Sequence, residues 1–249
     1  MRATLEQMSD SPAASIQEIS AGLFRINVPV GADVFPGGFS YNQYLLVDEM
    51  PLLFHTGPRR MFAQVREQIE KVMPVDQLRY IGFSHVEADE CGAMAEFLAA
   101  APKARPVCSE LAARSWARDQ YDAQAVALRD GQELGTGRHQ LVWISTPHLP
   151  HGRECGFLYE PKRRILFCGD LFAQGGPGET PITKEDIFRA SEAYRYQTDF
   201  YAYGRETPML IEKLAQLEPR VLACMHGSAW SGDGASLLRR LGAVLEEEL

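Results

Sequence analysis

Short apolar runs recur along the chain, and most of them end in a cluster of Gly, Pro, Ser or Asp residues. Runs of this kind, bounded by turn residues, predict β-strands. The expected strands are residues 22–30, 40–48, 51–57, 79–85, 105–110, 140–146, 156–161, 164–170 and 220–227. Because other patterns are interleaved with these runs, we predict sheets at the core rather than a helical bundle.

Helical patterns fill most of the gaps between the apolar runs. The expected helices are residues 60–72, 91–102, 109–121, 208–219 and 234–249, and a further helix is expected within 185–203. Segment 175–206 is otherwise the least regular part of the chain, and its start, GGPGETP, is typical of a loop. No stretch is typical of an interdomain linker. We therefore predict one α+β domain over residues 1–249, with mixed sheets and interleaved helices.

Composition and charge narrow the function classes. The chain has 249 residues, of which 45% are hydrophobic and 23% charged, which is typical of a globular protein with a sizeable core. A net charge of -8 argues against nucleic acid and against an anionic membrane surface as partners. The chain starts without the apolar segment of a secretory signal, and no apolar run approaches the roughly 20 residues that span a bilayer. We therefore expect a cytoplasmic protein, whose five scattered cysteines are reduced and mostly buried.

The segment RYIGFSHVEADECGAMAEFL carries the densest group of chemically active side chains. An apolar strand leads into His85, and Glu87, Asp89 and Glu90 follow within six residues, before a helical pattern resumes at Cys91. Carboxylates this close repel one another unless a cation or strong donors lie among them. The alternative is a solvated acidic turn in which Asp89 or Glu90 caps the next helix.

Other potential metal ligands also follow apolar strands. WISTPHLPH contains His148 and His151, RILFCGDLF contains Asp170, and ACMHGSAW contains His226. Residues just beyond strand ends converge on one edge of a sheet, where ligand sites form. A carboxylate after a strand as apolar as ILFCGD is costly to bury unpaired, and coordination of a metal removes that cost. Taken together, these segments predict a metal site.

The two remaining histidines have simpler interpretations. His55 follows the apolar residues PLLF and is expected to be a hydrogen-bonded core or loop histidine. His139 lies in the polar turn GTGRHQ and is expected at the surface.

The order of these motifs resembles the metallo-β-lactamase superfamily, whose members carry HxHxDH, a later His, a bridging Asp and a final His. Glu87 stands where the hydrolases have His, and this resembles the flavodiiron proteins and, more closely, their oxygen-binding diiron relatives, often abbreviated ODP. The matching segments are SHVEADE, TPHLPHG, LFCGDLF and MHGSAW, and YNQYLLVD with LLFHTG occupies the place of the family's first hairpin. The resemblance implies a four-layer αβ/βα sandwich with helices outside two facing mixed sheets.

The resemblance also implies a set of metal ligands. One iron is expected on His85, Glu87 and His151, a second on Asp89 and His226, and Asp170 is expected to bridge them. His151 is preferred to His148 because the next strand begins shortly after it. His148 is expected to be either an extra ligand or a residue that contacts a ligand without binding the metal. Glu90 is expected either to bind the second metal or to orient a ligand.

Charge supports iron as the metal. Three carboxylates offset most of the charge of two divalent ions, and Glu90 would complete the balance. A zinc hydrolase site on this scaffold has fewer carboxylates and keeps positive charge to acidify a bound water. Mixed His and carboxylate ligands suit non-haem iron, with manganese or zinc as alternatives.

Three functions are compatible with a dinuclear metal site. The first is an oxidoreductase that reduces dioxygen or nitric oxide with an external electron donor, because the flavodoxin domain of the flavodiiron relatives is not seen in this sequence. The second is a module that binds dioxygen and signals to a partner without turnover. The third is a dinuclear zinc hydrolase of thioesters or lactones. The relatives pair head to tail, which implies a homodimer by analogy.

Overall fold

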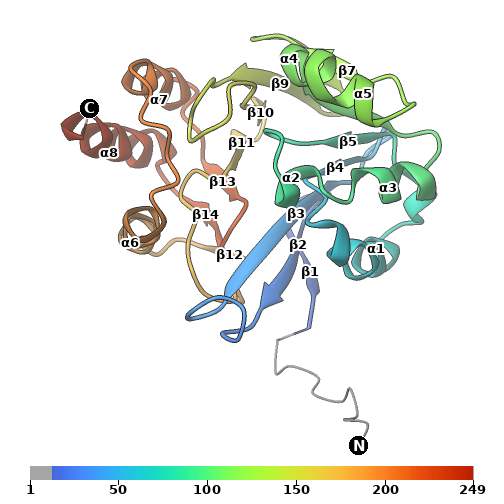
Figure 1. Cartoon of the computed structure of the whole chain (residues 1–249), viewed down its shortest axis with the longest axis horizontal. Coiled ribbons are helices and arrows are strands. Elements are labelled where there is room, and N and C mark those ends of the chain that lie inside the picture. Colours follow the sequence, from blue (N-terminus) through green and yellow to red (C-terminus); the bar gives the residue numbers. More distant parts are fainter. Residues whose placement is uncertain (1–12, 249) are drawn as a thin grey trace, which may run out of the picture.

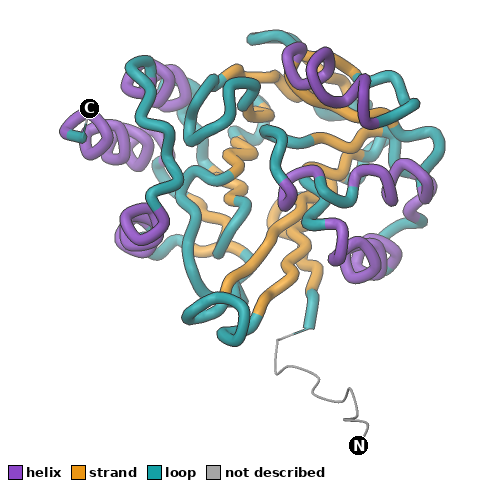
Figure 2. The backbone as a smooth tube through the Cα atoms, viewed as in Figure 1, coloured by secondary structure: helices purple, strands orange, loops and turns teal. Residues whose placement is uncertain are grey.

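Two β-sheets face each other between outer layers of helices in the computed structural model, which describes residues 13–248 (Figures 1 and 2). Helices α1 to α5 cover one sheet and helices α6 to α8 cover the other (Figure 1). The predicted α+β sandwich with helices outside two mixed sheets is confirmed. None of the helices between residues 13 and 248 combines the length and apolar character that crossing a bilayer requires.

The first sheet is built from the N-terminal half in the order β1-β2-β3-β4-β5-β6-β7. Its strands are β1 Ser15–Ser20, β2 Leu23–Val30, β3 Phe39–Leu46, β4 Leu52–Phe54, β5 Tyr80–Gly82, β6 Arg105–Ser109 and β7 Val126–Leu128. Strands β1 to β4 pair antiparallel, whereas β4 to β7 pair parallel. The parallel part needs a helical crossover between its strands, and this is where α1 to α5 lie.

The second sheet comes from the C-terminal half in the order β12-β14-β13-β11-β10-β9-β8. Its strands are β8 Glu133–Gly135, β9 Gln140–Ser145, β10 Gly156–Glu160, β11 Ile165–Gly169, β12 Ile182–Thr183, β13 Val221–Cys224 and β14 Ala229–Ser231. Strands β8 to β11 pair antiparallel, and β11 pairs parallel with β13.

The helices agree in place with the sequence pattern and differ in where they begin and end. They are α1 Phe62–Glu70, α2 Ala88–Cys91, α3 Met94–Ala100, α4 Glu110–Ala112, α5 Arg118–Gln120, α6 Phe188–Thr198, α7 Thr207–Ala215 and α8 Gly234–Glu247. A π-helical turn, Ala113–Ala117, joins α4 to α5. The helix expected within 185–203 is α6, which ends where Asp199 takes a left-handed conformation.

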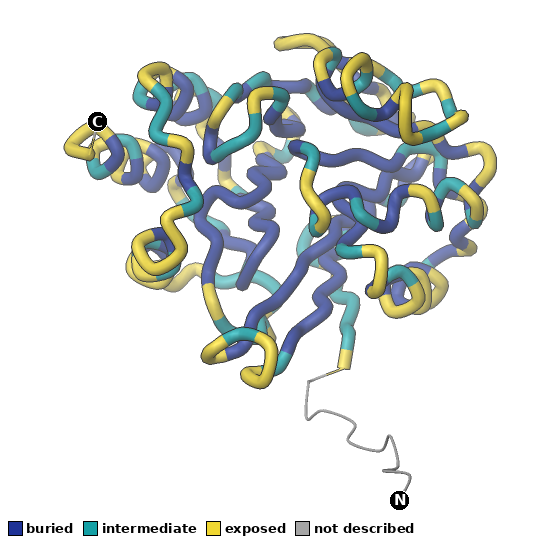
Figure 3. Tube along the Cα trace, viewed as in Figure 1, coloured by how far each residue is buried: buried dark blue, intermediate teal, exposed yellow. Residues whose placement is uncertain are grey.

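Apolar side chains fill three layers, which explains why the strands look apolar on both faces. In β4, Phe54 points between the sheets while Leu53 points under the helices of the first sheet. In β11, Phe167 joins the layer between the sheets and Leu166 joins the layer under α7 and α8. Strands buried on both faces read as continuous apolar runs rather than as alternating ones. Figure 3 shows these strands as buried from end to end.

The sequence pattern missed several short strands. They are β1, β7, β8, β12 and β14. Most have only two or three residues, which is too short for a periodic pattern, and β1 is a half-buried edge strand with polar residues at its centre. They extend the sheets without changing the edge at which the expected ligands meet.

Candidate metal centre

The expected ligands all lie just beyond strand ends at one edge of the two sheets. His85 follows β5, Asp170 follows β11 and His226 follows β13, while His151 lies in the loop between β9 and β10. The acidic residues come from the start of α2, which continues the chain after β5. These seven residues are called the edge cluster: His85, Glu87, Asp89, Glu90, His151, Asp170 and His226.

Helix α2 begins inside the acidic motif. It starts at Ala88, three residues before the expected start at Cys91, so that prediction was wrong. Glu87 is still extended, and Asp89 and Glu90 form the first turn. No side chain caps the helix, so neither Asp89 nor Glu90 has the capping role of the alternative interpretation. The turn ends at Gly92, where a Cβ atom would lie 2.2 Å from the Ala88 carbonyl oxygen.

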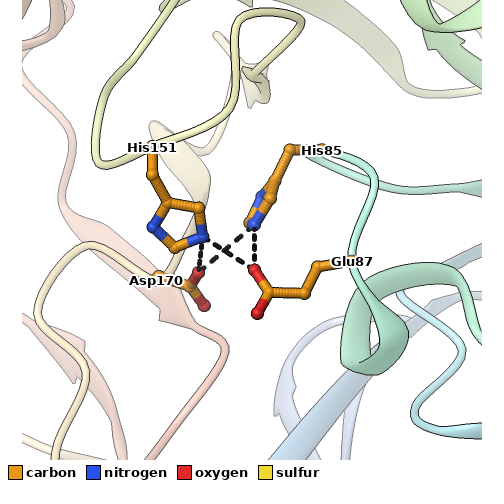
Figure 4. Close-up of side chains that lie close together, drawn as sticks. All are labelled: His85, Glu87, His151 and Asp170. Carbon is orange, nitrogen blue, oxygen red and sulfur yellow. Dashed lines mark hydrogen bonds and ion pairs between the residues drawn. The ribbon is translucent and has the colours of Figure 1, made fainter. Parts of the chain in front are cut away.

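Four side chains form the first half of the edge cluster (Figure 4). Glu87 Oε2 lies 3.0 Å from His85 Nε2 and 2.8 Å from His151 Nε2. Asp170 Oδ2 lies 3.6 Å from His85 Nε2 and 3.5 Å from His151 Nε2. One ligand atom of each residue lies within 4.8 Å of those of the other three, close enough for a single ion to reach all four.

The second half of the edge cluster uses the other oxygen of the same aspartate. Asp170 Oδ1 lies 3.2 Å from His226 Nε2, and Asp89 Oδ2 lies 3.4 Å from the same nitrogen. The two oxygens of Asp170 therefore face different histidines. This arrangement is the one expected of a carboxylate between two metal ions.

Each histidine of the edge cluster presents Nε2 inward and uses Nδ1 elsewhere. His151 Nδ1 lies 3.0 Å from the Phe200 carbonyl oxygen, and His226 Nδ1 lies 2.8 Å from that of Ser40. His85 Nδ1 lies 3.0 Å from the Ser84 hydroxyl oxygen. Metal-binding histidines usually donate their second N–H to such partners, which fixes the tautomer and the ring orientation.

Glu90 is the most unusual member of the edge cluster. Its side chain is fully buried, and neither carboxylate oxygen has a hydrogen-bond partner. Burial, with Asp170 and Asp89 beside it, raises the pKa of Glu90 well above its ordinary value. Among residues 13–248, no Lys or Arg forms an ion pair with any carboxylate of the edge cluster. Apart from the histidines, no cationic side chain therefore offsets the charge of these acids, which is costly to bury.

The histidines and acids shift one another's pKa values in opposite directions. Hydrogen bonds to His151 and His85 lower the pKa of Glu87 to about 2. Although burial opposes the charge, Asp170 and Asp89 raise the pKa of His226 to about 10. Both shifts favour positive charge between the carboxylates, which a metal ion supplies more strongly than a proton.

The other histidines lie outside the edge cluster. His148 is exposed and makes no ion pair with the clustered acids among the described residues, whereas His151 contacts two of them. His55 is buried as expected, and its Nε2 lies 3.1 Å from the Ser84 hydroxyl oxygen. The surface location expected for His139 is wrong, because its side chain is only 14% exposed and its Nδ1 lies 2.7 Å from Glu160 Oε1.

A cavity of about 400 Å³ opens onto the edge cluster. Aromatic side chains form much of its wall, with Arg60 as its cationic residue; the aromatic residues are Phe35, Phe39, Tyr41, Tyr194 and Phe200. Phe39 stacks on the His226 ring with centroids 4.4 Å apart, and Tyr194 stacks on Phe39 at 5.2 Å. The sequence pattern missed these residues, because aromatic residues scattered over β3, α6 and two loops carry no local motif.

The family of the chain follows from a comparison with known proteins. A family model described as "ODP family beta lactamase" matches residues 39–227, most of the chain. The chain belongs to the ODP family. The "Anaerobic nitric oxide reductase flavorubredoxin" of Salmonella arizonae is 27% identical over 203 residues, which are 78% of this chain and 42% of that protein. The chain therefore spans less than half the length of this relative.

Solved structures resemble the ODP-family chain over nearly all of its length. The rubredoxin oxygen:oxidoreductase of Desulfovibrio gigas has a TM-score of 0.77 and 18% identity, covering 92% of this chain and 61% of that one. A mutant flavo di-iron protein of Thermotoga maritima has a TM-score of 0.82 and 18% identity, covering 94% and 62%. At this level of identity the likeness shows the fold, and it confirms the resemblance to flavodiiron proteins.

Proposed function

We propose that the edge cluster holds two iron ions. His85, Glu87 and His151 would hold the first ion, Asp89 and His226 would hold the second, and Asp170 would bridge them. The observation that carries the proposal is the division of the Asp170 carboxylate, whose Oδ2 faces His85 and His151 while Oδ1 faces His226.

The donor set fits two divalent ions. Four carboxylates and three imidazoles are hard or borderline donors, and such donors suit iron or manganese. Zinc sites are usually richer in nitrogen and sulfur ligands. Four negative charges balance two divalent ions, and they leave little positive charge to acidify a bound water. We include Glu90 as a further ligand, because its buried oxygens have no other partner.

The activity that this site supports best is binding and reduction of dioxygen or nitric oxide. Iron supplies the capacity to exchange electrons with such small molecules, which zinc lacks. The protein's own residues would line the route to the edge cluster, since aromatic side chains form much of the cavity wall. Burial and the nearby Asp170 raise the pKa of Tyr194 to about 12, so its hydroxyl keeps its proton at neutral pH.

Electrons would come from a separate protein. The groups of potential metal ligands found among residues 13–248 all lie at the same edge, so the described part of the chain offers no second metal centre to feed the first. The same observation favours a second candidate function, in which the chain binds dioxygen reversibly and signals to a partner. Turnover separates the two candidates, because only an oxidoreductase consumes dioxygen or nitric oxide in proportion to an added reductant.

We also propose a homodimer and a cytoplasmic location. The five cysteines are free and buried, in keeping with a reducing compartment. The homodimer is an analogy with the flavodiiron relatives, and light scattering of the iron-loaded protein at several concentrations tests it.

Anaerobic loading with iron tests the central proposal. We expect close to two irons per chain by elemental analysis and a change in the optical spectrum when air is admitted. A protein that takes up zinc in preference to iron, and shows no spectral change with air, would support the hydrolase of thioesters or lactones instead.

A pair of variants tests the ligand assignment. His151→Ala should lose iron at the first site, whereas His148→Ala should bind iron as the unmodified protein does, because His148 lies outside the edge cluster. Equal losses in both variants would show that both histidines coordinate.

A further inference from the structure

Three buried side chains form a continuous chain that ends at an expected metal ligand. His55 follows β4, and its Nε2 lies 3.1 Å from the Ser84 hydroxyl oxygen. The same oxygen lies 3.0 Å from His85 Nδ1, and all three side chains are almost completely buried. This chain is called the His55–Ser84–His85 relay.

The proton positions in the relay follow from the orientation of His85. Its Nε2 faces the carboxylates of the edge cluster, so a metal ion would bind there and Nδ1 would carry the proton. Nδ1–H then donates to the Ser84 oxygen, and the Ser84 hydroxyl proton needs another acceptor. His55 Nε2 is that acceptor, because burial lowers the pKa of His55 to about 3 and keeps the ring neutral.

His55 occupies its position at a cost. Its φ angle is +65°, in the left-handed region that residues other than Gly, Asn and Asp rarely adopt. The tautomer that accepts from Ser84 carries its proton on Nδ1, which is buried with no hydrogen-bond partner. Each feature destabilises the folded chain. A side chain kept in place against such costs commonly serves a site, and here the nearest site is the edge cluster.

The segment that contains His55 is also fixed to the acidic helix. The Thr56 backbone N–H donates to the Glu90 carbonyl oxygen at 2.8 Å, and the Ala93 N–H donates to Thr56 Oγ1 at 3.1 Å. The His55 N–H donates to the Gly82 carbonyl oxygen at 2.8 Å. Movement of this segment would therefore disturb both His85 and α2.

We propose that Ser84 and His55 are positioning residues, which hold His85 in the tautomer and orientation that bind metal. They would also make the Nε2 atom of His85 a stronger ligand to the metal. This inference rests on the proposed role of His85 as a metal ligand. It assigns a role to His55 that the sequence pattern did not, since PLLFHTG looked like an ordinary strand end. It also gives Ser84 a role other than packing.

Metal titration of four proteins tests the relay: the unmodified chain, Ser84→Ala, His55→Asn and the double variant. Asn tolerates the left-handed conformation but is too short to reach Ser84, so His55→Asn removes the acceptor without adding backbone strain. We expect Ser84→Ala to weaken Co(II) binding by about 10- to 100-fold, as is typical for groups behind a metal ligand. The double variant should bind no more weakly than Ser84→Ala, because His55 acts through the hydroxyl. Independent losses that multiply in the double variant would overturn the relay.

Proton NMR of the Co(II)-loaded protein gives a readout that a purely structural role would not move. The N–H protons of the three ligand histidines should appear as separate, metal-shifted signals that exchange with solvent. Ser84→Ala should shift or speed the exchange of the His85 signal alone, and Ser84→Thr, which keeps the hydroxyl, should restore it. His139→Phe, far from the edge cluster, is the control.

Two results would contradict the inference and leave the proposed function intact. One is normal metal affinity and an unchanged His85 N–H signal in Ser84→Ala and His55→Asn. The other is loss of that signal in Cys155→Ala but not in Ser84→Ala, since the Cys155 thiol also interacts with the His85 ring. Failure of the unmodified chain to bind Co(II) or iron would instead contradict the proposed function itself.

Discussion

Buried carboxylates gather at both ends of the sandwich, and the side chains that pair with them differ between the two ends. At the end away from the edge cluster, Asp48 accepts hydrogen bonds from Thr136, from the Arg138 guanidinium and from the His139 backbone N–H. Glu160 beside them contacts His139 and Arg163. At the edge cluster, four carboxylates face three histidines and no Lys or Arg pairs with them among the described residues.

The same strands run from one end of the sandwich to the other, so the fold alone does not explain why the carboxylates at the two ends have different partners. Strand β3 begins beside Ser40, whose carbonyl accepts from His226, and it is followed by Asp48 at its other end. Acids whose oxygens are all matched by protein donors need nothing else. The acids of the edge cluster repel one another, and Glu90 has no hydrogen-bond partner, so these are the acids that the proposed metal ions would stabilise. The contrast therefore separates a structural cluster from the proposed metal site.

Asp170→Ala gives the largest expected effect. If this carboxylate bridges two ions, its removal should reduce metal content from about two ions per chain to near none. Elemental analysis after anaerobic loading measures this. Asp48→Ala removes a buried carboxylate from the opposite end and should keep full metal content. Full occupancy in Asp170→Ala would show that this residue is not the bridge.

Glu87→His tests whether a carboxylate selects the metal. The substitution removes one negative charge from the first site and adds a borderline nitrogen donor, so we expect the ratio of bound iron to zinc to fall by at least ten-fold. Competitive anaerobic loading with equal iron and zinc, followed by elemental analysis, measures the ratio. An unchanged ratio would leave the preference for iron without a physical basis in Glu87.

Glu90→Leu should stabilise the metal-free chain and reduce the stability gained on metal loading. Without metal, replacing a buried carboxylate that has no partner with an apolar side chain should raise the free energy of unfolding by about 1–3 kcal/mol. With metal, the gain in stability on loading should be smaller than in the unmodified chain, because one ligand is gone. Denaturant unfolding with and without iron measures both terms. A loss of stability in the metal-free variant would mean that the contact between Glu90 and His85 Nε2, which lies 3.8 Å from Glu90 Oε2, outweighs the cost of burying the carboxylate.

Asp48→Asn gives the smallest effect, and its size depends on pH. The hydrogen bonds from Arg138 and Thr136 outweigh burial and hold the pKa of Asp48 well below its ordinary value. A lowered folded-state pKa stabilises the fold above the ordinary value near 3.8 and loses that contribution as pH falls through the folded-state value. The variant should be about 1–2 kcal/mol less stable at pH 7, with a smaller difference at pH 3. Metal content should not change, and an equal difference at both pH values would contradict the assignment.

The sequence by itself determined the class of fold and the identity of the candidate ligands. Apolar runs ending in turn residues located most strands, because strands buried on both faces must be apolar throughout. His85, Glu87, Asp89, His151, Asp170 and His226 stood out because charged and imidazole side chains directly after such strands are costly without a partner. Short edge strands stayed hidden, since two or three residues carry no period.

Only the tertiary structure decided how these residues are used. It turned Asp170 Oδ2 toward His85 and His151 and Asp170 Oδ1 toward His226, because strands distant in sequence end at the same edge. It placed His148 outside the edge cluster and buried Glu90 without a hydrogen-bond partner. It also gave His55 and His139 hydrogen-bond partners that the sequence pattern did not predict, because Ser84 and Glu160 lie more than twenty residues away in the chain. Local sequence carries the chemistry of a side chain, whereas its partner is set by the packing of the two sheets.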